Sequence, residues 1–213
     1  SGFFGHTTIG MLRLNNVQDC IHRVLERNIP GDIVETGAWR GGSAIFMRAV
    51  LKHFDVSDRT VWVADSFEGF PEISIDNADY TGDAEIDVKS FNDGGPLDLW
   101  LSVPLKKVKG NFERYGLLDD QVEFLPGWFH DTLPNAPIEK ISVLRLDGDL
   151  YKSTMDALNA LYNKVSVGGF VIVDDYNCWP HCKAAVDEYR NRLGITSPMI
   201  EIDQFGVYWE VAN

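Results

Sequence analysis

The chain has 213 residues, 45% hydrophobic and 24% charged, which is ordinary for a globular protein with a full core. Its formal net charge of −13 argues against a nucleic-acid backbone as partner, and no basic amphipathic segment indicates binding to a membrane surface. Three cysteines, no visible signal peptide and no apolar run near the roughly 20 residues of a membrane span predict one cytoplasmic domain over 1–213.

The N-terminal part of the chain contains one predicted helix. The first two residues, Ser1-Gly2, are typical of the scar left when an expression tag is cleaved. Asn15 or Asn16 can cap a helix whose apolar residues fall on one face. The pair Pro30-Gly31 is expected to end it, because proline does not continue a helix.

From residue 32 onward, short apolar runs alternate with amphipathic segments. We expect strands at 32–36, 61–65, 121–125, 141–147 and 169–174, with helices that begin at Ser43 and at about 104, 153 and 180. The last two runs, 199–202 and 207–211, are joined by a short link and should form an antiparallel pair. This pattern predicts an α/β fold with a mostly parallel sheet covered on both faces, similar to the seven-stranded Rossmann-like sheet of class I methyltransferases.

Residues 66–101 interrupt this alternation. The segment is rich in aspartate and glycine and carries no apolar periodicity. A polar insert of this length inside a compact domain is usually a functional lid or a disordered loop. We expect part of it to order over the site when an acceptor binds.

Two apolar runs end in aspartates: Asp147 and Asp149 follow the first, and Asp174 and Asp175 follow the second. If the two strands are parallel neighbours, their ends lie roughly 4.8 Å apart, and two charges about 5 Å apart repel by roughly 3 kcal/mol at an effective dielectric near 20. A raised pKa, a nearby cation or a bound metal must relieve this repulsion. Oxygen ligands suit Mg²⁺, or else Ca²⁺ or Mn²⁺, rather than zinc. The alternative is that these acids simply end strands and cap the next helices.

The turn after the first strand is a candidate cofactor site. Glycines from Gly37 onward let the backbone approach a ligand, and Ser43 can cap the following helix. Glu35 would repel a diphosphate but attract the sulfonium and amine of S-adenosylmethionine (SAM). Asp65 ends the second strand, where an acid can take both ribose hydroxyls. A tight turn with an exposed glutamate is the alternative interpretation.

With these residues in place, the chain resembles the macrocin O-methyltransferase family, whose members methylate sugar hydroxyls of macrolides and aminocoumarins using SAM and Mg²⁺. The resemblance spans nearly the whole chain and is carried by the segments 31–43, 65–71, 127–134, 146–154 and 168–176. The insert at 66–101 departs from any segment that can be matched, which leaves the acceptor open. Family members also have a longer N-terminal segment that helps to form a dimer and the substrate pocket.

The resemblance implies a division of the site. Glu35 and Gly37 would flank the methionine portion of SAM, and Asp65 and Ser66 would hold its ribose. The resemblance alone places the next two residues near the adenine: Trp128 and Phe129. It assigns the metal to three residues, Asp147, Asp174 and Asp175.

The chemistry expected of this site is metal-dependent O-methylation of a small-molecule acceptor, a sugar or another vicinal diol. Asp147 is the candidate for both metal ligand and proton acceptor, with Asp149, His130 and His181 as alternative bases. A rival interpretation is an NAD-dependent oxidoreductase, although no tyrosine has a lysine four residues on. Another is a non-catalytic SAM- or metal-binding domain. We expect a homodimer or one part of a larger multidomain synthase.

Overall fold

The computed structural model describes residues 5–70 and 100–212, and every structural statement below concerns these residues. Residues 71–99 of the predicted lid lie outside the described residues, as does the Ser1-Gly2 pair. Among the described helices, none is both long and apolar enough to cross a membrane.

Strands and helices alternate along the chain as expected. The strands are β1 (Asp32–Thr36), β2 (Val61–Asp65), β3 (Val122–Pro126), β4 (Ile141–Leu146), β5 (Val165–Val173), β6 (Ile200–Glu201) and β7 (Val207–Glu210). The helices are α1 (Gly10–Glu26), α2 (Gly42–His53), α5 (Leu105–Arg114), α6 (Phe129–Thr132), α7 (Tyr151–Leu161) and α8 (Pro180–Leu193), with the 3-10 turns η3 (Leu133–Asn135) and η4 (Tyr162–Lys164).

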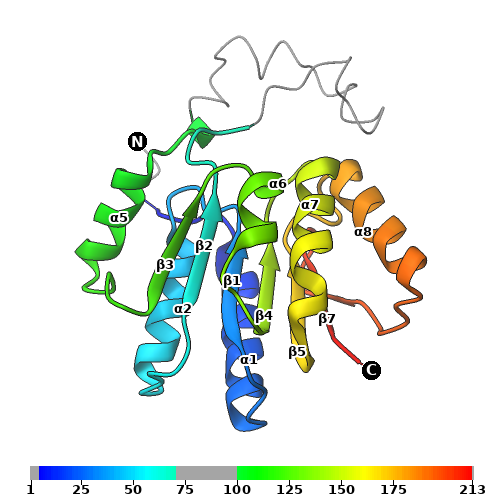
Figure 1. Ribbon diagram of the computed structural model, residues 1–213, viewed down its shortest axis with the longest axis horizontal. Helices are drawn as coiled ribbons and strands as arrows, with labels where there is room; N and C mark the ends of the chain where they lie inside the picture. The colour runs from blue at the N-terminus through cyan, green and yellow to red at the C-terminus, as the bar shows by residue number, and fades with distance from the viewer. Residues whose placement is uncertain (1–4, 71–99, 213) are drawn as a thin grey trace.

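The strands form one seven-stranded sheet in the order β3-β2-β1-β4-β5-β7-β6 (Figure 1). The first five strands pair in parallel, whereas β7 runs antiparallel to both of its neighbours. This topology confirms the predicted α/β fold with its terminal antiparallel pair. The short link predicted between the last two strands forces the reversal, because a parallel connection needs a crossover of a dozen or more residues.

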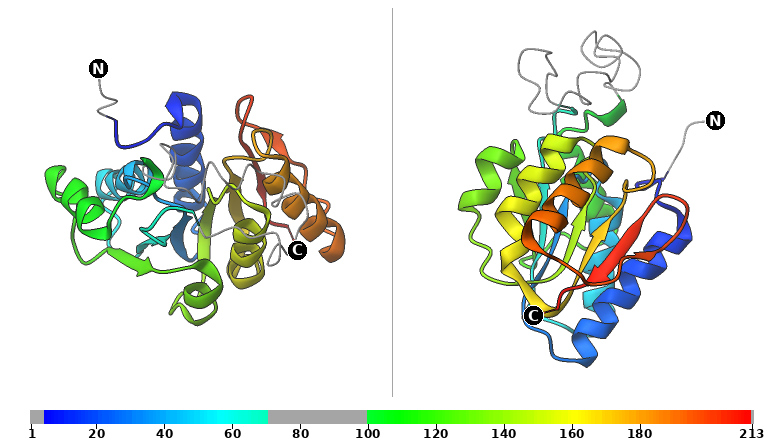
Figure 2. Two further views of the ribbon diagram at one scale, coloured as in Figure 1. Left: turned by 90° about the horizontal axis from the view of Figure 1, so that it is seen from above. Right: turned by 90° about the vertical axis from the view of Figure 1, so that its right-hand side faces the viewer.

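Helices cover both faces of the sheet (Figure 2). One hydrophobic cluster packs α1, α2 and α5 against one face, and a second packs α7 and α8 against the other. Successive residues of β1 divide between the two clusters: Ile33 belongs to the first and Val34 to the second. A strand buried on both faces explains why these runs are continuously apolar rather than alternating.

Two predicted helix starts are wrong. Helix α1 begins at Gly10, so Asn15 and Asn16 lie inside the helix instead of capping it. Helix α2 begins at Gly42 behind the left-handed residue Gly41, so Ser43 lies in the first turn. In α1 the added turns are held by tertiary contacts, described below for Arg13, which outweigh the weak helix propensity of asparagine.

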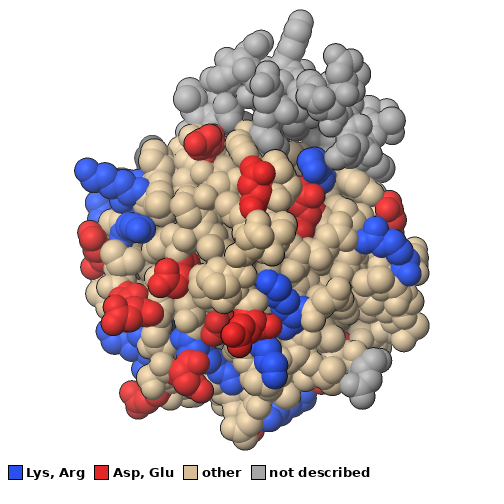
Figure 3. All heavy atoms as spheres, viewed as in Figure 1, with Lys and Arg blue, Asp and Glu red and all other residues tan. Residues whose placement is uncertain are grey.

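The face drawn in Figure 3 carries charges of both signs. Lysine and arginine side chains are interspersed with aspartate and glutamate on this face, and neither sign forms a continuous band. The negative net charge of the chain is therefore not segregated on this face. Among the described residues, a group of acids gathers instead at the carboxyl edge of the parallel strands, where ligands bind in open α/β sheets.

Candidate active site

A cavity of about 300 Å³ lies at the carboxyl ends of the parallel strands and is lined from both sides. Residues after β1 and β2 form one part, including Gly37, Asp65 and Ser66. The loops after β4 and β5 form the other, including Asp147 and Asp174. The size fits a small-molecule site. The two sets of residues predicted from separate motifs therefore meet in one place.

Gly37 brings the two parts into contact. Its φ is +90°, and a Cβ at this position would lie 1.8 Å from the carbonyl oxygen of Asp147. Any side chain would therefore push the turn after β1 away from the end of β4. Glycine is required here both by the left-handed conformation and by the close approach.

Asp65 organises the turn after β1. Its carboxylate accepts hydrogen bonds from the backbone N–H groups of Ala38 at 2.6 Å, Trp39 at 3.1 Å and Phe67 at 2.7 Å. Burial raises the pKa of Asp65, and these three hydrogen bonds oppose the shift. A carboxylate has about four acceptor positions, so about one remains for a ribose hydroxyl. The bonds also hold Trp39 in a left-handed conformation, φ +47°, that is uncommon for a non-glycine residue.

Ser66 forms a compact turn. Its hydroxyl donates to the carbonyl of Gly69 at 2.9 Å and accepts from the N–H of Glu68 at 3.1 Å. Trp128 and Phe129 follow β3, line the cavity and are half-buried, and Phe129 begins the short helix α6. The predicted ribose and adenine residues thus all reach the cavity.

Glu35 occupies a different place from the other predicted cofactor residues. Its side chain is fully buried and does not line the cavity. Burial raises the pKa of Glu35 to about 7, while the charge of Arg145 and a hydrogen bond from Ser43 lower it. Contact between Glu35 and a cofactor stays a prediction. In the structure, Glu35 binds Arg145.

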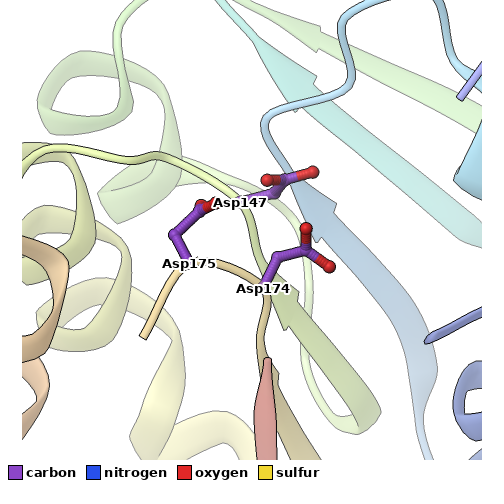
Figure 4. A group of neighbouring side chains, drawn as sticks. All are labelled: Asp147, Asp174 and Asp175. Atoms are coloured by element: carbon purple, nitrogen blue, oxygen red, sulfur yellow. The ribbon is translucent and has the colours of Figure 1, made fainter. Parts of the chain in front are cut away.

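The predicted metal ligands do converge. Asp147, from the loop after β4, and Asp174 and Asp175, which follow β5, point toward a common space (Figure 4). One carboxylate oxygen from each residue lies within 4.8 Å of the others. Asp174 and Asp175 are 3% and 8% exposed, so two of the three are almost completely removed from water. The parallel pairing of β4 with β5 produces this convergence.

Arg145 was missed by the sequence analysis and is the centre of the cluster. Its side chain is fully buried on β4, and its Nη1 lies 2.7 Å from Glu35 Oε1 and 2.7 Å from Asp147 Oδ2. Its Nη2 lies 2.5 Å from Asp174 Oδ1. The sequence did contain a signal: an arginine inside an apolar strand that ends in acids needs buried carboxylate partners.

The remaining acids of the cluster are not fully neutralised by Arg145. Burial raises the pKa of Asp174 to about 6, and burial together with neighbouring carboxylates raises the pKa of Asp149 and Asp175 well above the usual range. Among the described residues, Oδ2 of Asp175 is buried without a hydrogen-bond partner. Asp149 adopts a left-handed conformation, φ +57°. A second positive charge, that of the half-buried Arg13 of α1, also pairs with Asp174.

The alternative bases considered from sequence differ in position. His130 lines the cavity, but its side chain is 50% exposed and lies near Asp131 and Asp156. His181 lies in the first turn of α8 and does not line the cavity. Asp149 does line it. Of the candidate bases, Asp147, Asp149 and His130 therefore reach the cavity and His181 does not.

Comparisons with known proteins show what the whole chain is similar to. The family model described as macrocin-O-methyltransferase (TylF) matches residues 2–211. The chain is 56% identical over 204 residues to mycinamicin III 3''-O-methyltransferase of Micromonospora griseorubida, covering 96% of this chain and 78% of that protein. It is 54% identical over 205 residues to demethyldecarbamoylnovobiocin O-methyltransferase of Streptomyces niveus, covering 96% and 75%.

Solved structures give the same picture. The O-methyltransferase NovP superposes with a TM-score of 0.90 at 53% identity, covering 98% of this chain and 83% of that chain. The calicheamicin methyltransferase CalS11 superposes with a TM-score of 0.72 at 20% identity, covering 98% and 82%, which shows a shared fold.

Proposed function

The chain belongs to the macrocin O-methyltransferase family, and on that premise we propose that it methylates a sugar hydroxyl of a natural product with the help of a divalent cation held by Asp147, Asp174 and Asp175. It is a SAM-dependent O-methyltransferase. One observation carries the proposal: the acidic cluster and the turn after β1 line the same cavity and touch at Gly37.

The donor set fits a hard divalent cation. All three groups are carboxylates, the ligand type that Mg²⁺, Mn²⁺ and Ca²⁺ prefer. Five carboxyl groups gather here, from Glu35, Asp147, Asp149, Asp174 and Asp175. The guanidinium groups that pair with them among the described residues are those of Arg13 and Arg145. The buried Oδ2 of Asp175 still lacks a partner among the described residues. When bound, a divalent cation lowers the pKa of a hydroxyl that it contacts and fixes its direction.

The half of the cavity after β1 and β2 would hold SAM. The N–H groups of Gly37, Ala38 and Trp39 already donate within the protein. The polar groups left for the ribose are the remaining acceptor position of Asp65 and the second acceptor position of the Ser66 hydroxyl. Trp128 and Phe129 offer apolar surface for the adenine. This arrangement would aim the methyl group at the acidic half.

The acidic half would orient the acceptor and remove its proton. Methyl transfer forms an oxygen–carbon bond while the carbon–sulfur bond breaks, so the hydroxyl proton must go to a base. Asp147 is the candidate from sequence, but its Oδ2 already accepts a hydrogen bond from Nη1 of Arg145 at 2.7 Å, which leaves Oδ1 as the oxygen available for the proton. Burial raises the pKa of Asp149, which also lines the cavity, well above its usual range, and Asp149 is the second candidate.

A methyl-transfer assay with matched acceptors tests the proposal. Glycosides with a free vicinal diol should be methylated in Mg²⁺, while the same glycosides with either hydroxyl removed should react at least about 100-fold more slowly, the scale of a lost orienting contact. Activity on the deoxy acceptors equal to that on the diols would refute chelation by two hydroxyls. Full activity in excess EDTA would refute the role of the cation.

Asp147→Asn and Asp149→Asn then separate the two candidate bases. A variant that removes only the base should retain the affinity for the divalent cation, whereas a variant that removes a ligand should lose it. Calorimetric titration with Mn²⁺ alongside turnover therefore assigns each aspartate to one role or to both.

A further inference from the structure

Arg13 connects the N-terminal helix to the acidic cluster. It lies in the first turns of α1, with a side chain only 12% exposed, and lines the cavity. Its Nη1 is hydrogen-bonded to Oδ2 of Asp174, and its Nε lies 3.0 Å from Oδ2 of Asp203 in the turn between β6 and β7. One guanidinium group therefore bridges two carboxylates, of which only the first belongs to the acidic cluster.

Asp174 has no carboxylate oxygen free of a guanidinium. Arg145 pairs with Oδ1 at 2.5 Å, and Arg13 pairs with Oδ2. A cation that binds an oxygen of Asp174 must therefore compete with an arginine. The two arginines differ in how easily they can yield. Arg145 is fully buried and also holds Glu35, so moving it would leave buried charges unpaired.

Arg13 already has a second partner. Asp203 is fixed by its own turn, since its Oδ1 accepts the N–H groups of Phe205 and Gly206, each at 2.9 Å. This leaves Oδ2 for Arg13. Gly206 leaves room for the arginine, because a Cβ there would lie 3.2 Å from Cδ of Arg13. The guanidinium also lies over the ring of Phe205, 5.5 Å from its centroid.

We propose that Arg13 is an exchangeable counterion of the cation site: it occupies Asp174 when no cation is present and shifts entirely to Asp203 when a divalent cation binds. The proposal rests on the cation site proposed above. The bond to Asp203 persists in both states, so α1 stays attached to the turn between β6 and β7. Thr7, Thr8 and Ile9 line the same cavity as Arg13. Arg13 is therefore a positioning residue, and its shift links cation binding to the part of the cavity wall that these three residues form.

Direct titration of cation binding tests the exchange without relying on activity. Arg13→Gln removes the competing charge, so the affinity for Mn²⁺ or Mg²⁺ should rise by at least about fivefold, as expected when one like charge beside the site is removed. A purely structural role for Arg13 predicts the opposite sign, because a disordered cluster binds the cation more weakly. Unchanged or weaker binding would overturn the proposal.

Arg23→Gln is the matched control. Arg23 lies on the same helix and pairs with Glu210 at 3.0 Å, remote from the acidic cluster. Its removal should change cation affinity by less than about twofold. If Arg13→Gln does not fold, Arg13→Lys takes its place, because one ammonium group cannot reproduce the planar fork that bridges both carboxylates. Wild-type cation affinity in that variant would count against the exchange.

A double-mutant cycle tests the destination of Arg13. Asp203→Asn should weaken cation binding, and the loss should shrink by at least about threefold when Arg13 is already glutamine, because the two residues act together. An equal loss of cation affinity with Arg13 and with glutamine at position 13 would mean that Asp203 acts only through its charge. That result would overturn the proposed shift of Arg13 to Asp203. Absence of cation binding in the wild type and in every variant would refute the cation site itself, whereas wild-type binding unaffected by Arg13→Gln would refute only the exchange.

Discussion

The two halves of the cavity are held together by different kinds of interaction. The turn after β1 is fixed by backbone N–H groups that converge on Asp65 and by the close contact at Gly37. The loops after β4 and β5 are fixed by the side chains of Arg145 and Arg13. Backbone geometry is set by the fold, whereas a guanidinium can be exchanged for another cation. On the proposals above, the first half is preformed, whereas the second exchanges an arginine for a divalent cation.

The largest effect should come from removing the buried counterion. Arg145→Met should lower the free energy of unfolding by about 3–5 kcal/mol at pH 8 without divalent cations, because three carboxylates lose their buried partner. Urea denaturation of the wild type and the variant measures this difference in the free energy of unfolding. Arg23→Met, which breaks the partly exposed pair with Glu210, should cost less than about 1 kcal/mol. Equal losses would mean that Arg145 does not organise the cluster.

The same variant has a predicted pH dependence. In the wild type, Arg145 lowers the pKa of Asp174 and of Glu35 against the effect of burial. Without Arg145, the folded-state pKa of Asp174 and of Glu35 rises further. At a pH above these pKa values the buried ionised carboxylates lower the stability of the variant, whereas at a pH below them the carboxyls are neutral and the loss of Arg145 costs less. The difference in stability between wild type and variant should therefore shrink as the pH falls from 8 to 5.

The second effect concerns turnover. Asp147→Asn should reduce kcat by at least about 100-fold, the usual range for a lost base. We expect a reduction of similar size if Asp147 acts as a ligand of the cation instead. The dissociation constant for SAM should stay within about threefold, since the groups expected to hold SAM follow β1 and β2. Asp156→Asn, in the same cavity, serves as the control and should retain most activity. Loss of SAM affinity in Asp147→Asn would show that the halves are not separate.

Sequence patterns predicted the half built by backbone and strand order better than the half built by side chains. Strand ends such as Asp65 and Asp174 are visible in a sequence because apolar runs stop there, and the parallel order brings them together. The partners of Arg145 come from one strand, β1, and from the two loops that follow β4 and β5. Arg13 reaches its partners across 161 and 190 residues of chain, and no local pattern records such contacts.

The same reasoning explains the misplaced helix starts. Local capping rules favoured Asn15 and Asn16, but Ile9 precedes the observed helix without a side-chain cap. The helix extends because Arg13 is anchored at the acidic cluster. Likewise Ser43 hydrogen-bonds to the buried Glu35 instead of capping α2. Tertiary contacts with buried charges are strong enough to override a capping preference of about 1 kcal/mol.

The third effect tests the preformed half. Asp65→Asn places an amide where three N–H donors converge, so the turn should loosen and SAM should bind more weakly by about 1–3 kcal/mol. Calorimetric titration with SAM measures this change in binding free energy. The affinity for Mn²⁺ should stay within about twofold, because Asp65 is not part of the acidic cluster. A variant that loses the cation as well would mean that the turn after β1 also supports the loops after β4 and β5.

The smallest effect should be that of removing the cation from the intact protein. Chelation with EDTA should abolish turnover, which Mg²⁺ should restore, yet the far-UV circular dichroism should not change and SAM affinity should shift by less than about twofold. The fold survives because Arg145 and Arg13 already neutralise part of the cluster in the cation-free state. SAM binding survives because the turn at Gly37 is held by backbone hydrogen bonds that need no cation. The contact between Gly37 and the carbonyl of Asp147 is one route by which the cation could still act on the cofactor side. A SAM affinity that falls more than tenfold in EDTA would identify that contact as a coupling element and would remove the distinction between a preformed and an exchangeable half.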